Sequence, residues 1–538
     1  MNLVRFFPWF ATILGAVVLG PVAIIQDSVW LSVAAGLCAI LALVGLYDFM
    51  QRKRTILRNY PILGHGRYLM ESIRPEIRQY FIEDDLHGRP FNREDRSLIY
   101  QRAKGDKDYD PFGSELDMRE VGYEWIGHSI RPAKPLEHAA HVTVGAAQCK
   151  RPYDISLLNV SAMSYGALGP SAVQAMGRGA KEAGFAHNTG EGGVSRYHLA
   201  TGADLVWQIG TGYFACRAKD GTFSKEAFTK QASHDSIKMI EVKLSQGAKP
   251  GHGGILPAYK VTPEIAEARG VAVGEACLSP PGHSAFSTPK QLVEFVDQLR
   301  ELSGGKPVGI KLCVGLPQEF MGIVKAMVES GSGPDFITVD GGEGGTGAAP
   351  PEFGDHVGMP LEEGLVFVAN AIRGAGLRDR VKIAASGKVA SAMDVLRCIV
   401  LGADYTNAAR AFMISVGCIQ AQLCHTNECP VGVATLDPLR NRGLDPKLKG
   451  VRAARYHRET MHALLELVGA SGFQDPHDVP LDRIRRRVSP YDVRRLDELY
   501  PRENSGALLE GKGSAELQEL YDRASSESFA AEAPAPTH

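Results

Sequence analysis

Short apolar runs alternate with amphipathic stretches through the middle of the chain. Eight runs rich in β-branched or other apolar residues are each followed by Gly or Ser. They are Ile155–Ser161, Gly184–His187, Leu205–Gly210, Met239–Leu244, Val308–Leu312, Phe336–Val339, Val381–Ala385 and Ala403–Ala408. Helical patterns lie between them, for instance over residues 170–184, 288–302, 317–331 and 390–402. This alternation predicts an α/β fold, a parallel (β/α)8 TIM barrel. A doubly wound sheet is the alternative, but no GxGxxG motif follows the first strand.

The N-terminus has a different pattern, with apolar residues and no charge. Phe6–Ile25 and Val29–Tyr47 are two such runs, each about as long as a bilayer is thick. Only Gln26–Ser28 separate them, which predicts a transmembrane helical hairpin. Arg5 precedes the first run and Gln51–Arg54 follows the second with three basic residues. The positive-inside rule therefore predicts that both ends of the hairpin, and the catalytic domain, are cytoplasmic. A signal peptide is disfavoured because a second run follows at once.

These patterns divide the chain into four parts. We expect a transmembrane hairpin with its basic flank at 1–54 and a linker or packing region at 55–150. The barrel with a cysteine loop follows at 151–470, and a C-terminal helical segment with a disordered tail at 471–538. Pro75, inside a helical pattern, predicts short helices in the second part. The tail, ASSESFAAEAPAPTH, has the composition of a disordered segment.

Charge and cysteine usage narrow the class of protein. The formal net charge of −2 gives no field that attracts nucleic acid, so we expect no nucleic-acid partner. Six of the nine cysteines are scattered without pairing logic, which predicts a reduced, cytoplasmic domain.

The other three cysteines form a spaced triplet, Cys418, Cys424 and Cys429, in the pattern C-x5-C-x4-C. An odd number of cysteines does not complete a disulfide framework. Thiolates at short, unequal spacing in a turn-rich segment are typical of iron–sulfur ligands. Three ligands suit a three-iron cluster, although spacing does not count irons. Buried apolar cysteines and an incomplete zinc site are the alternatives.

In a TIM barrel the active site lies at the carboxyl ends of the strands. After the first strand come small residues that let a flat ring approach the backbone: Ser161, Ala162, Met163 and Ser164. The glycine-rich ends of strands six to eight, with a lysine or an arginine, favour phosphate binding. The residues there are Gly341, Gly342, Gly387, Lys388, Ala409 and Arg410.

Charged residues at other strand ends are candidates for cofactor and substrate binding. Lys311 interrupts the apolar run VGIKLCV, and a lysine inside a barrel is costly without an anion or an electron-rich ring. It suits the N1/O2 edge of a flavin, and an outward-facing Lys311 is the alternative. Glu191, Gln246 and Lys249 supply a carboxylate, an amide and a cation, which suits a substrate with carboxylates and a carbonyl or imine. Structural roles for these three are the alternative.

Five motifs together resemble the FMN-binding domain of glutamate synthases. They are SAMSYGALG, HNTGEGG, KLSQGAKPGHGG, VDGGEGGTGA and CHTNECPVGVAT, and the resemblance runs from about Tyr153 to about Ala470. It implies a (β/α)8 barrel with FMN and a 3Fe-4S cluster that reduces 2-iminoglutarate, formed from 2-oxoglutarate and ammonia, to L-glutamate. Electrons would come from a ferredoxin-like or other external donor, through the cluster to FMN.

The same resemblance implies roles for particular residues. Cys418, Cys424 and Cys429 correspond to cluster ligands, and Glu191, Gln246 and Lys249 to contacts of 2-oxoglutarate or its imine. The positions that correspond to flavin contacts are Ser161 to Ser164, Lys311, Gly341, Gly342, Gly387, Lys388 and Arg410.

The sequence departs from that family in several places. A complete glutamate synthase begins with a glutaminase domain, whereas this chain begins with the apolar hairpin, so we expect ammonia or an amine from another source. We also expect no C-terminal β-helix of the kind found in the large synthases. His252 stands where many members have Glu, and Ser386-Gly387 replaces Asp-Gly-Gly. These departures leave two alternatives open: chemistry on a related amine, imine or N-alkyl-glutamate, and a membrane-tethered electron-transfer flavoprotein.

Overall fold

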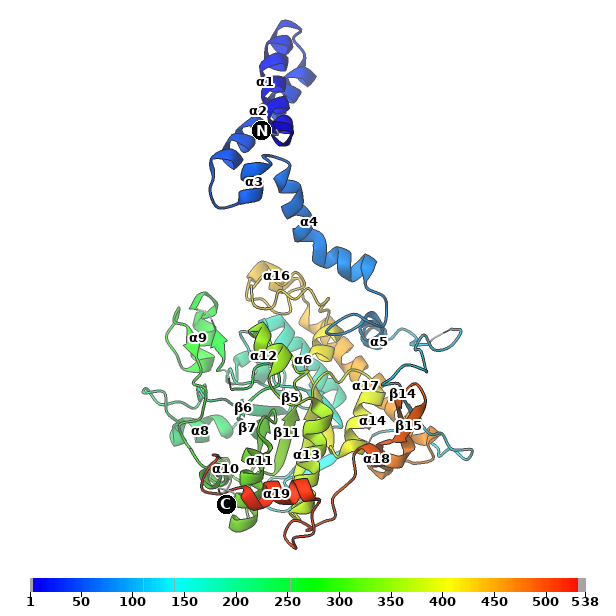
Figure 1. Ribbon diagram of the computed structural model, residues 1–538. Helices are drawn as coiled ribbons and strands as arrows, with labels where there is room; N and C mark the ends of the chain where they lie inside the picture. The colour runs from blue at the N-terminus through cyan, green and yellow to red at the C-terminus, as the bar shows by residue number, and fades with distance from the viewer. Residues whose placement is uncertain (1–2, 110, 140, 252, 257, 531–538) are drawn as a thin grey trace, which may run out of the picture. The chain divides into compact units, whose positions relative to one another are not determined.

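The computed structural model describes residues 3–109, 111–139, 141–251, 253–256 and 258–530 (Figure 1). The chain forms two compact units, residues 1–92 and 93–538. The division falls inside the predicted packing region 55–150. Helix α5 (Arg93–Lys104) belongs to the second unit because it packs against α15 (Arg410–Ser415) and α17 (Pro446–Ala470).

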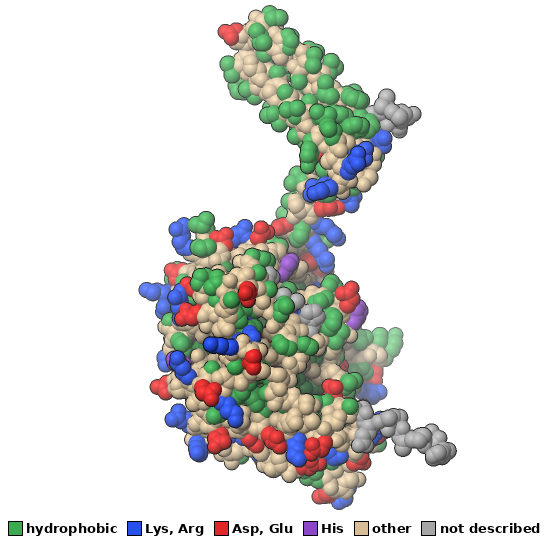
Figure 2. Space-filling view, turned by 90° about the vertical axis from the view of Figure 1, so that its left-hand side faces the viewer, with side chains coloured by type: hydrophobic (Ala, Val, Ile, Leu, Met, Phe, Trp, Pro, Cys, Tyr) green, Lys and Arg blue, Asp and Glu red, His purple; other side chains and the backbone are tan. Residues whose placement is uncertain are grey.

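The first unit begins with two apolar helices, α1 (Phe7–Ile25) and α2 (Val29–Met50), which pack against each other. Both are long and apolar enough to cross a membrane, and only 6% of each apolar window is buried. Hydrophobic side chains cover much of the visible face of this hairpin, and Lys and Arg side chains follow it (Figure 2). The two predicted apolar runs are therefore confirmed as helices that could span a bilayer.

After the hairpin come α3 (Thr55–Asn59), α4 (Gly64–Ile77) and a π-helical turn, η2 (Arg78–Ile82). The prediction that Pro75 keeps the helices short is wrong, because α4 runs through it for 14 residues. Proline lacks an N–H and removes one bond of the helical ladder, and the wider π turn follows directly.

The second unit contains the predicted barrel, in which eight parallel strands close in the order β4-β5-β6-β7-β10-β11-β12-β13. Each strand overlaps one predicted run, which confirms the (β/α)8 fold. The strands are β4 (Leu158–Val160), β5 (His187–Asn188), β6 (Leu205–Ile209), β7 (Ile237–Lys243), β10 (Val308–Leu312), β11 (Phe336–Asp340), β12 (Lys382–Ser386) and β13 (Tyr405–Ala408).

Helices between the strands cover the barrel, and the four predicted helical patterns are among them. They are α6 (Pro170–Ala183), α7 (Arg196–Leu199), α8 (Lys225–Ala232), α10 (Pro289–Leu302), α11 (Pro317–Ser330), α12 (Pro351–His356), α13 (Leu361–Gly374) and α14 (Ala392–Leu401). Ser224, Thr288 and Ser391 each accept a backbone N–H and so fix the starts of α8, α10 and α14. After the barrel, α16 (Pro438–Arg442) leads to α17, which packs along α6.

One buried carboxylate establishes which strand faces point into the barrel. Glu241 on β7 accepts hydrogen bonds from Asn188 (2.9 Å), Gln208 (2.7 Å) and Thr338 (2.7 Å). Because β10 separates β7 from β11, the bond to Thr338 crosses the barrel interior. Side chains alternate along a strand, so Lys243, two residues after Glu241, faces the same interior. Lys311 pairs in register with both Thr338 and Lys243 and also points inward.

The segment between β7 and α10 is an insertion that returns to the mouth of the barrel. It contains β8 (Ile255–Leu256), a 3-10 turn η3 (Ala258–Lys260), α9 (Pro263–Arg269) and β9 (Cys277–Leu278), with β8 and β9 paired antiparallel.

The C-terminal segment, predicted to be helical, contains a β-hairpin instead. Its strands β14 (Ile484–Ser489) and β15 (Asp492–Arg495) extend from β1 (Glu124–Ile126), while β2 (Val142–Val144) and β3 (Tyr153–Ile155) form a separate pair. Helices α18 (Leu496–Leu499) and α19 (Ala515–Arg523) follow, with 3-10 turns η4 (Pro476–Asp478) and η5 (Leu481–Arg483) earlier in the segment.

The start of the predicted disordered tail is ordered against the barrel helices. The backbone N–H of Lys290 on α10 donates to Ser526 O (2.9 Å), and Lys325 Nζ on α11 donates to Ala524 O (2.8 Å). The tail prediction is therefore wrong at residues 524–526, where hydrogen bonds to backbone carbonyls hold the chain and Ala524 and Ser526 are buried. Residues 531–538 lie outside the described part of the chain.

Candidate active site

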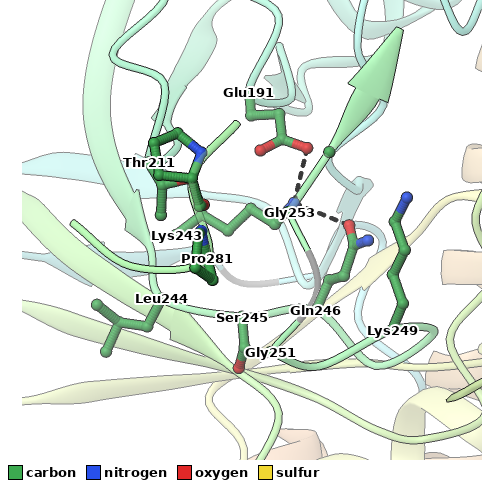
Figure 3. A pocket seen from close by; sticks show the side chains of 12 residues that line it. Glu191, Thr211, Lys243, Leu244, Ser245, Gln246, Lys249, Gly251, Gly253 and Pro281 are labelled. Carbon is green, nitrogen blue, oxygen red and sulfur yellow. Dashed lines mark hydrogen bonds and ion pairs between the residues drawn. The ribbon is translucent and has the colours of Figure 1, made fainter. Parts of the chain in front are cut away.

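A cavity that is partly open to solvent lies at the carboxyl end of β7 (Figure 3). Glu191, Gln246 and Lys249, the three predicted substrate residues, all line it, so the structure brings them together. His252, singled out in the sequence, lies outside the described residues. The complete lining is Glu191, Thr211, Lys243, Leu244, Ser245, Gln246, Lys249, Gly251, Gly253, Gly254, Pro280 and Pro281.

Lys243, which was not among the residues predicted from the sequence, lies at the centre of this group. Its Nζ lies 2.8 Å from Oε1 of Glu191 and 2.8 Å from Oε1 of Gln246 (Figure 3). One cation thereby orients two predicted site residues. A signal was present, since Lys243 ends a largely apolar run just as Lys311 interrupts one, and both face the barrel interior.

Glu191 is a carboxylate in this setting. Burial alone would raise the pKa of Glu191, but the charge and hydrogen bond of Lys243, with the charges of Arg269 and Lys249, bring it below its ordinary value. The carboxylate is also tightly enclosed. A Cβ on Gly210 would lie 2.6 Å from Oε2 of Glu191, so a larger residue there would displace the carboxylate.

Lys249 is a second cation of the cavity, with 7% of its surface exposed. Burial first, and then the charge of Lys243, lower the pKa of Lys249, while Glu191 opposes them. No residue that the structure describes forms an ion pair with Lys249, so its charge can act on a bound anion. Its loop crosses the end of β11 so closely that a Cβ on Gly247 would lie 1.8 Å from Gly341 O. Only glycine permits this path.

Arg269, at the end of α9, is a third cation near Glu191 and was also missed. Its Cζ lies 4.9 Å from the centre of the Phe214 ring, and its Nη2 donates to Tyr165 O (3.4 Å). Its buried Nε has no hydrogen-bond partner within the described part of the chain. No local pattern marks this arginine, because only the course of the insertion brings α9 close enough for its charge to act on Glu191. Arg269 is not among the residues that line the cavity, whose charged side chains are Lys243, Lys249 and Glu191.

Lys311 faces the barrel interior, which excludes the outward-facing alternative. Its Nζ lies 3.3 Å from Oδ2 of Asp340, and both side chains are nearly buried. The same oxygen accepts the Gly247 N–H (2.8 Å). The anion that the buried lysine requires is therefore Asp340, and a contact with a flavin stays a prediction.

The residues predicted to contact the flavin ring and phosphate lie at the ends of β4, β11, β12 and β13. Ser161 Oγ lies 3.1 Å from Ser386 Oγ, so small side chains from β4 and β12 meet there, with Ala162, Met163 and Ser164 partly exposed beside them. The amides of Gly341 and Gly342 donate to Ser386 O (2.8 Å) and Met359 O (2.9 Å). Because these two amides already donate to backbone carbonyls, they are not available to a phosphate. The predicted phosphate site therefore depends on the neighbouring residues.

Those neighbours are Gly387, Lys388, Ala409 and Arg410, which follow the adjacent strands β12 and β13. Lys388 has a positive φ of 54° and an exposed side chain. Arg410 donates from Nη2 to Glu343 O and lies against Gly345. Burial lowers the pKa of Arg410, while Asp340 and Glu343 raise it. Two cations at adjacent strand ends provide the charge that a phosphate needs.

The cysteine triplet lies in the loop after α15, with Cys429 buried and Cys418 and Cys424 partly buried. Burial, and then the negative charges of Cys424 and Cys429, raise the pKa of Cys418 to about 12. A hydrogen bond from the Gln420 amide opposes this rise. The three thiols are therefore close enough together for the charges of Cys424 and Cys429 to affect the pKa of Cys418.

Two side chains from elsewhere hold the backbone of this loop. Tyr100 Oη on α5 donates to Cys418 O (2.6 Å), and Lys260 Nζ donates to Cys424 O (3.3 Å). Across the described ranges no three His, Cys, Asp or Glu side chains surround a single metal position. In a cluster each thiolate binds its own iron, so the sulfurs lie farther apart than around one ion. The cluster assignment stays a prediction.

A closed parallel barrel with a charged cavity at its carboxyl end defines the class of (β/α)8 enzymes. Residues 126–474 match the family model described as a conserved region in glutamate synthase. The chain belongs to the glutamate synthase family and is an oxidoreductase, as the motifs predicted.

Relatives agree with this assignment. The chain is 37% identical over 501 residues to the glutamate synthase large subunit-like protein YerD of Bacillus subtilis, covering 86% of this chain and 95% of YerD. It is 34% identical over 401 residues to the archaeal glutamate synthase (NADPH) of Methanocaldococcus jannaschii, covering 72% and 74%. The match to the archaeal-type enzyme of Thermotoga maritima covers 58% of each chain at 34% identity.

Solved structures with a similar outline include a mandelate oxidase variant, at a TM-score of 0.40 and 15% identity, covering 80% of this chain and 96% of that one. A flavocytochrome b2 variant has a TM-score of 0.41 and 14% identity, covering 78% and 85%. Likenesses of this size carry no argument about function.

Proposed function

We propose that this protein is a membrane-anchored, glutamate synthase-like enzyme that reduces an imine of 2-oxoglutarate to L-glutamate. The observation that supports this most is the excess of positive charge in the cavity lining, from Lys243 and Lys249 against Glu191. The charge of Arg269 also acts on Glu191. A substrate with two carboxylates carries the complementary charge. Family membership supports the reaction class, and the positive charge of the cavity supports an anionic substrate.

Each charged residue has a part in this proposal. Lys249, which lines the cavity and has no ion-pair partner among the described residues, binds a substrate carboxylate. Arg269 adds positive charge near Glu191. Glu191, kept ionised by Lys243, accepts a hydrogen bond from the imine N–H and favours the protonated imine, whose carbon is the better hydride acceptor. Gln246, fixed by the same lysine, orients the substrate beside it.

Two cofactors fit the residues around the cavity. Ser161 and Ser386 leave room for a flat ring, Lys311 supplies buried positive charge, and Lys388 with Arg410 supplies charge for a phosphate, which together suit FMN. Three mutually interacting thiols suit a 3Fe-4S cluster held by Cys418, Cys424 and Cys429. When bound, FMN supplies the hydride, and the cluster supplies one-electron transfer from a ferredoxin-like or other donor.

The α1–α2 hairpin supports anchoring to a membrane, with the barrel unit on the cytoplasmic side because basic residues follow α2. The nitrogen source in this proposal is ammonia, free or delivered by another protein.

A steady-state assay tests the reaction. Purified full-length protein is given 2-oxoglutarate, ammonium or methylamine, and reduced ferredoxin or viologen, and glutamate or N-methylglutamate is measured. We expect glutamate from ammonium, and we expect Lys249→Ala to abolish it while Lys230→Ala, on the exposed face of α8, does not. Turnover with methylamine but not with ammonium would show that the nitrogen source is an amine and not ammonia. No turnover with either would overturn the proposal.

A further inference from the structure

The segment that follows the membrane hairpin, residues 51–82, is strongly basic. It contains seven Lys and Arg residues and two Glu residues, a net charge of +5, although the whole chain carries −2. The basic residues are Arg52, Lys53, Arg54, Arg58, Arg67, Arg74 and Arg78. A concentration of this kind next to membrane helices matches the anionic surface of a cytoplasmic leaflet.

The same segment exposes a row of large apolar side chains. Leu69, Ile73, Ile77 and Phe81 recur every four residues, so they share one face of α4 and η2. Leu69 is 57% exposed, Ile73 37% and Phe81 84%. Beside them Met70, at 55%, and Ile82, at 71%, widen the apolar surface. An exposed apolar surface of this extent marks an interaction site.

Basic and apolar side chains meet along one edge of this helix. A shallow groove on α4 is lined by Arg67, Met70, Glu71, Arg74 and Ile77. Arg67, Arg74 and Arg78 follow one another at intervals of seven and four residues, so they flank the apolar row on one side. An apolar face bordered by arginines is the arrangement of helices that lie in the membrane interface.

Hydrogen bonds fasten this helix to the end of the membrane hairpin. The buried Asp48, near the end of α2, accepts the backbone N–H of Ile62 (3.0 Å) and lies 2.9 Å from Nε2 of His65. Arg54 lies over the ring of Tyr68, 4.8 Å from its centre. These contacts place the start of α4 beside the residue at which α2 would leave the bilayer.

We propose that α4 and η2, residues 64–82, form an in-plane helix that binds anionic phospholipid. The row at Leu69, Ile73, Ile77 and Phe81 enters the boundary between headgroups and acyl chains. Arg74 contacts phosphates, and so do Arg67 and Arg78, although these two also pair with Glu71 (2.8 Å) and Glu83 (3.1 Å). This inference rests on the proposed insertion of α1 and α2 in a membrane, and it adds a second, lipid-selective contact.

Hydrogen–deuterium exchange of the full-length protein in nanodiscs tests the proposal. One preparation contains phosphatidylcholine alone and the other contains phosphatidylglycerol as well. We expect amide exchange in residues 64–82 to be about tenfold slower or more in the anionic discs, because lipid binding stabilises a helix that otherwise frays. We expect the peptides of the hairpin to be protected equally in both preparations.

Two pairs of substitutions test the basic residues and the apolar residues of this helix separately. Arg74→Glu with Arg78→Glu should remove the difference between the two lipids, and so should Phe81→Ser with Ile82→Ser. The control, Lys225→Glu with Lys230→Glu on α8, changes the net charge as much as the arginine pair does and should keep the difference.

Three results would overturn the proposal. Equal exchange of residues 64–82 in both lipids would exclude anionic lipid as the occupant of this face. Slow exchange that persists in detergent would assign the face to a protein contact. Rapid exchange in the hairpin peptides would show that α1 and α2 are not inserted, and this result alone would also remove membrane anchoring from the proposed function.

Discussion

The ammonium group of Lys243 lies 2.8 Å from a carboxylate oxygen of Glu191 and 2.8 Å from the amide oxygen of Gln246. Glu191 follows β5 and Gln246 follows β7, so one side chain joins the ends of two barrel strands. The charge of this lysine also contributes to the low pKa of Glu191 and, after burial, to the lowered pKa of Lys249. Lys243 is therefore the residue whose loss disturbs the most cavity groups.

Replacing Lys243 with methionine should lower kcat/KM by about a hundredfold. Glu191 loses its hydrogen bond and its nearest cation, so its pKa should rise, and the acidic limb of the rate profile should move to higher pH. Lys243→Arg should retain part of the activity. Rates measured from pH 5 to pH 9 check this, with Lys230→Met on α8 as the control. An unchanged pH profile in Lys243→Met would show that the lysine is only structural.

The buried pair of Lys311 and Asp340 predicts a double-mutant effect on stability. Lys311→Met leaves a buried carboxylate without its cation, which costs about 3–5 kcal/mol and should lower the Tm. In Lys311→Met with Asp340→Asn no charge is left unpaired, so most of the loss should return. Thermal unfolding of all three proteins in detergent measures this. A double variant no more stable than Lys311→Met would contradict the pairing.

The cysteine triplet predicts iron content. Cys424→Ser should reduce the iron in anaerobically purified protein from about three atoms per chain to little or none, because a cluster with one ligand missing is lost. Cys149→Ala, far from the triplet in the sequence, should leave the iron unchanged. Iron analysis and paramagnetic resonance spectra check both variants. Full iron in Cys424→Ser would mean that the cluster ligands lie elsewhere.

Asp95 on α5 predicts a change of stability with pH. Burial first, and then the charge of Asp394, raise the pKa of Asp95 to about 6 from 3.8. The folded state thus binds this proton more tightly than the unfolded state, so the stabilisation is complete below pH 3.8 and is lost as pH rises through 6. Asp95→Asn, neutral at every pH, should therefore be more stable than the parent at pH 7.5, by up to about 3 kcal/mol.

That advantage should disappear near pH 4, where Asp95 is protonated in the folded state. Thermal unfolding from pH 4 to pH 8 gives the comparison, and Asp106→Asn on the exposed turn after α5 is the control. If Asp95→Asn were less stable than the parent at pH 7.5, Asp95 would be an ionised partner in an ion pair.

The sequence predicted the barrel well because strand and helix periods differ and each strand end carries a recognisable turn. It also predicted that Glu191, Gln246 and Lys249 lie at the same end of the barrel, because each of them follows a barrel strand. Arg269 could not be predicted, because its position depends on the route of an insertion that no local pattern records. Lys243 could have been predicted, because it also lies in a largely apolar barrel strand, as Lys311 does. The ordering of residues 524–526 was missed because it depends on contacts with α10 and α11 that the composition of the tail does not reveal.

The most direct test of the proposed function is an anaerobic titration of the purified protein with 2-oxoglutarate, followed by flavin absorbance. The account predicts bound FMN whose spectrum changes saturably with 2-oxoglutarate. It predicts a much weaker response in Lys249→Ala and an unchanged response in Lys230→Ala. Protein that carries no flavin, or a flavin spectrum that 2-oxoglutarate does not alter, would contradict it.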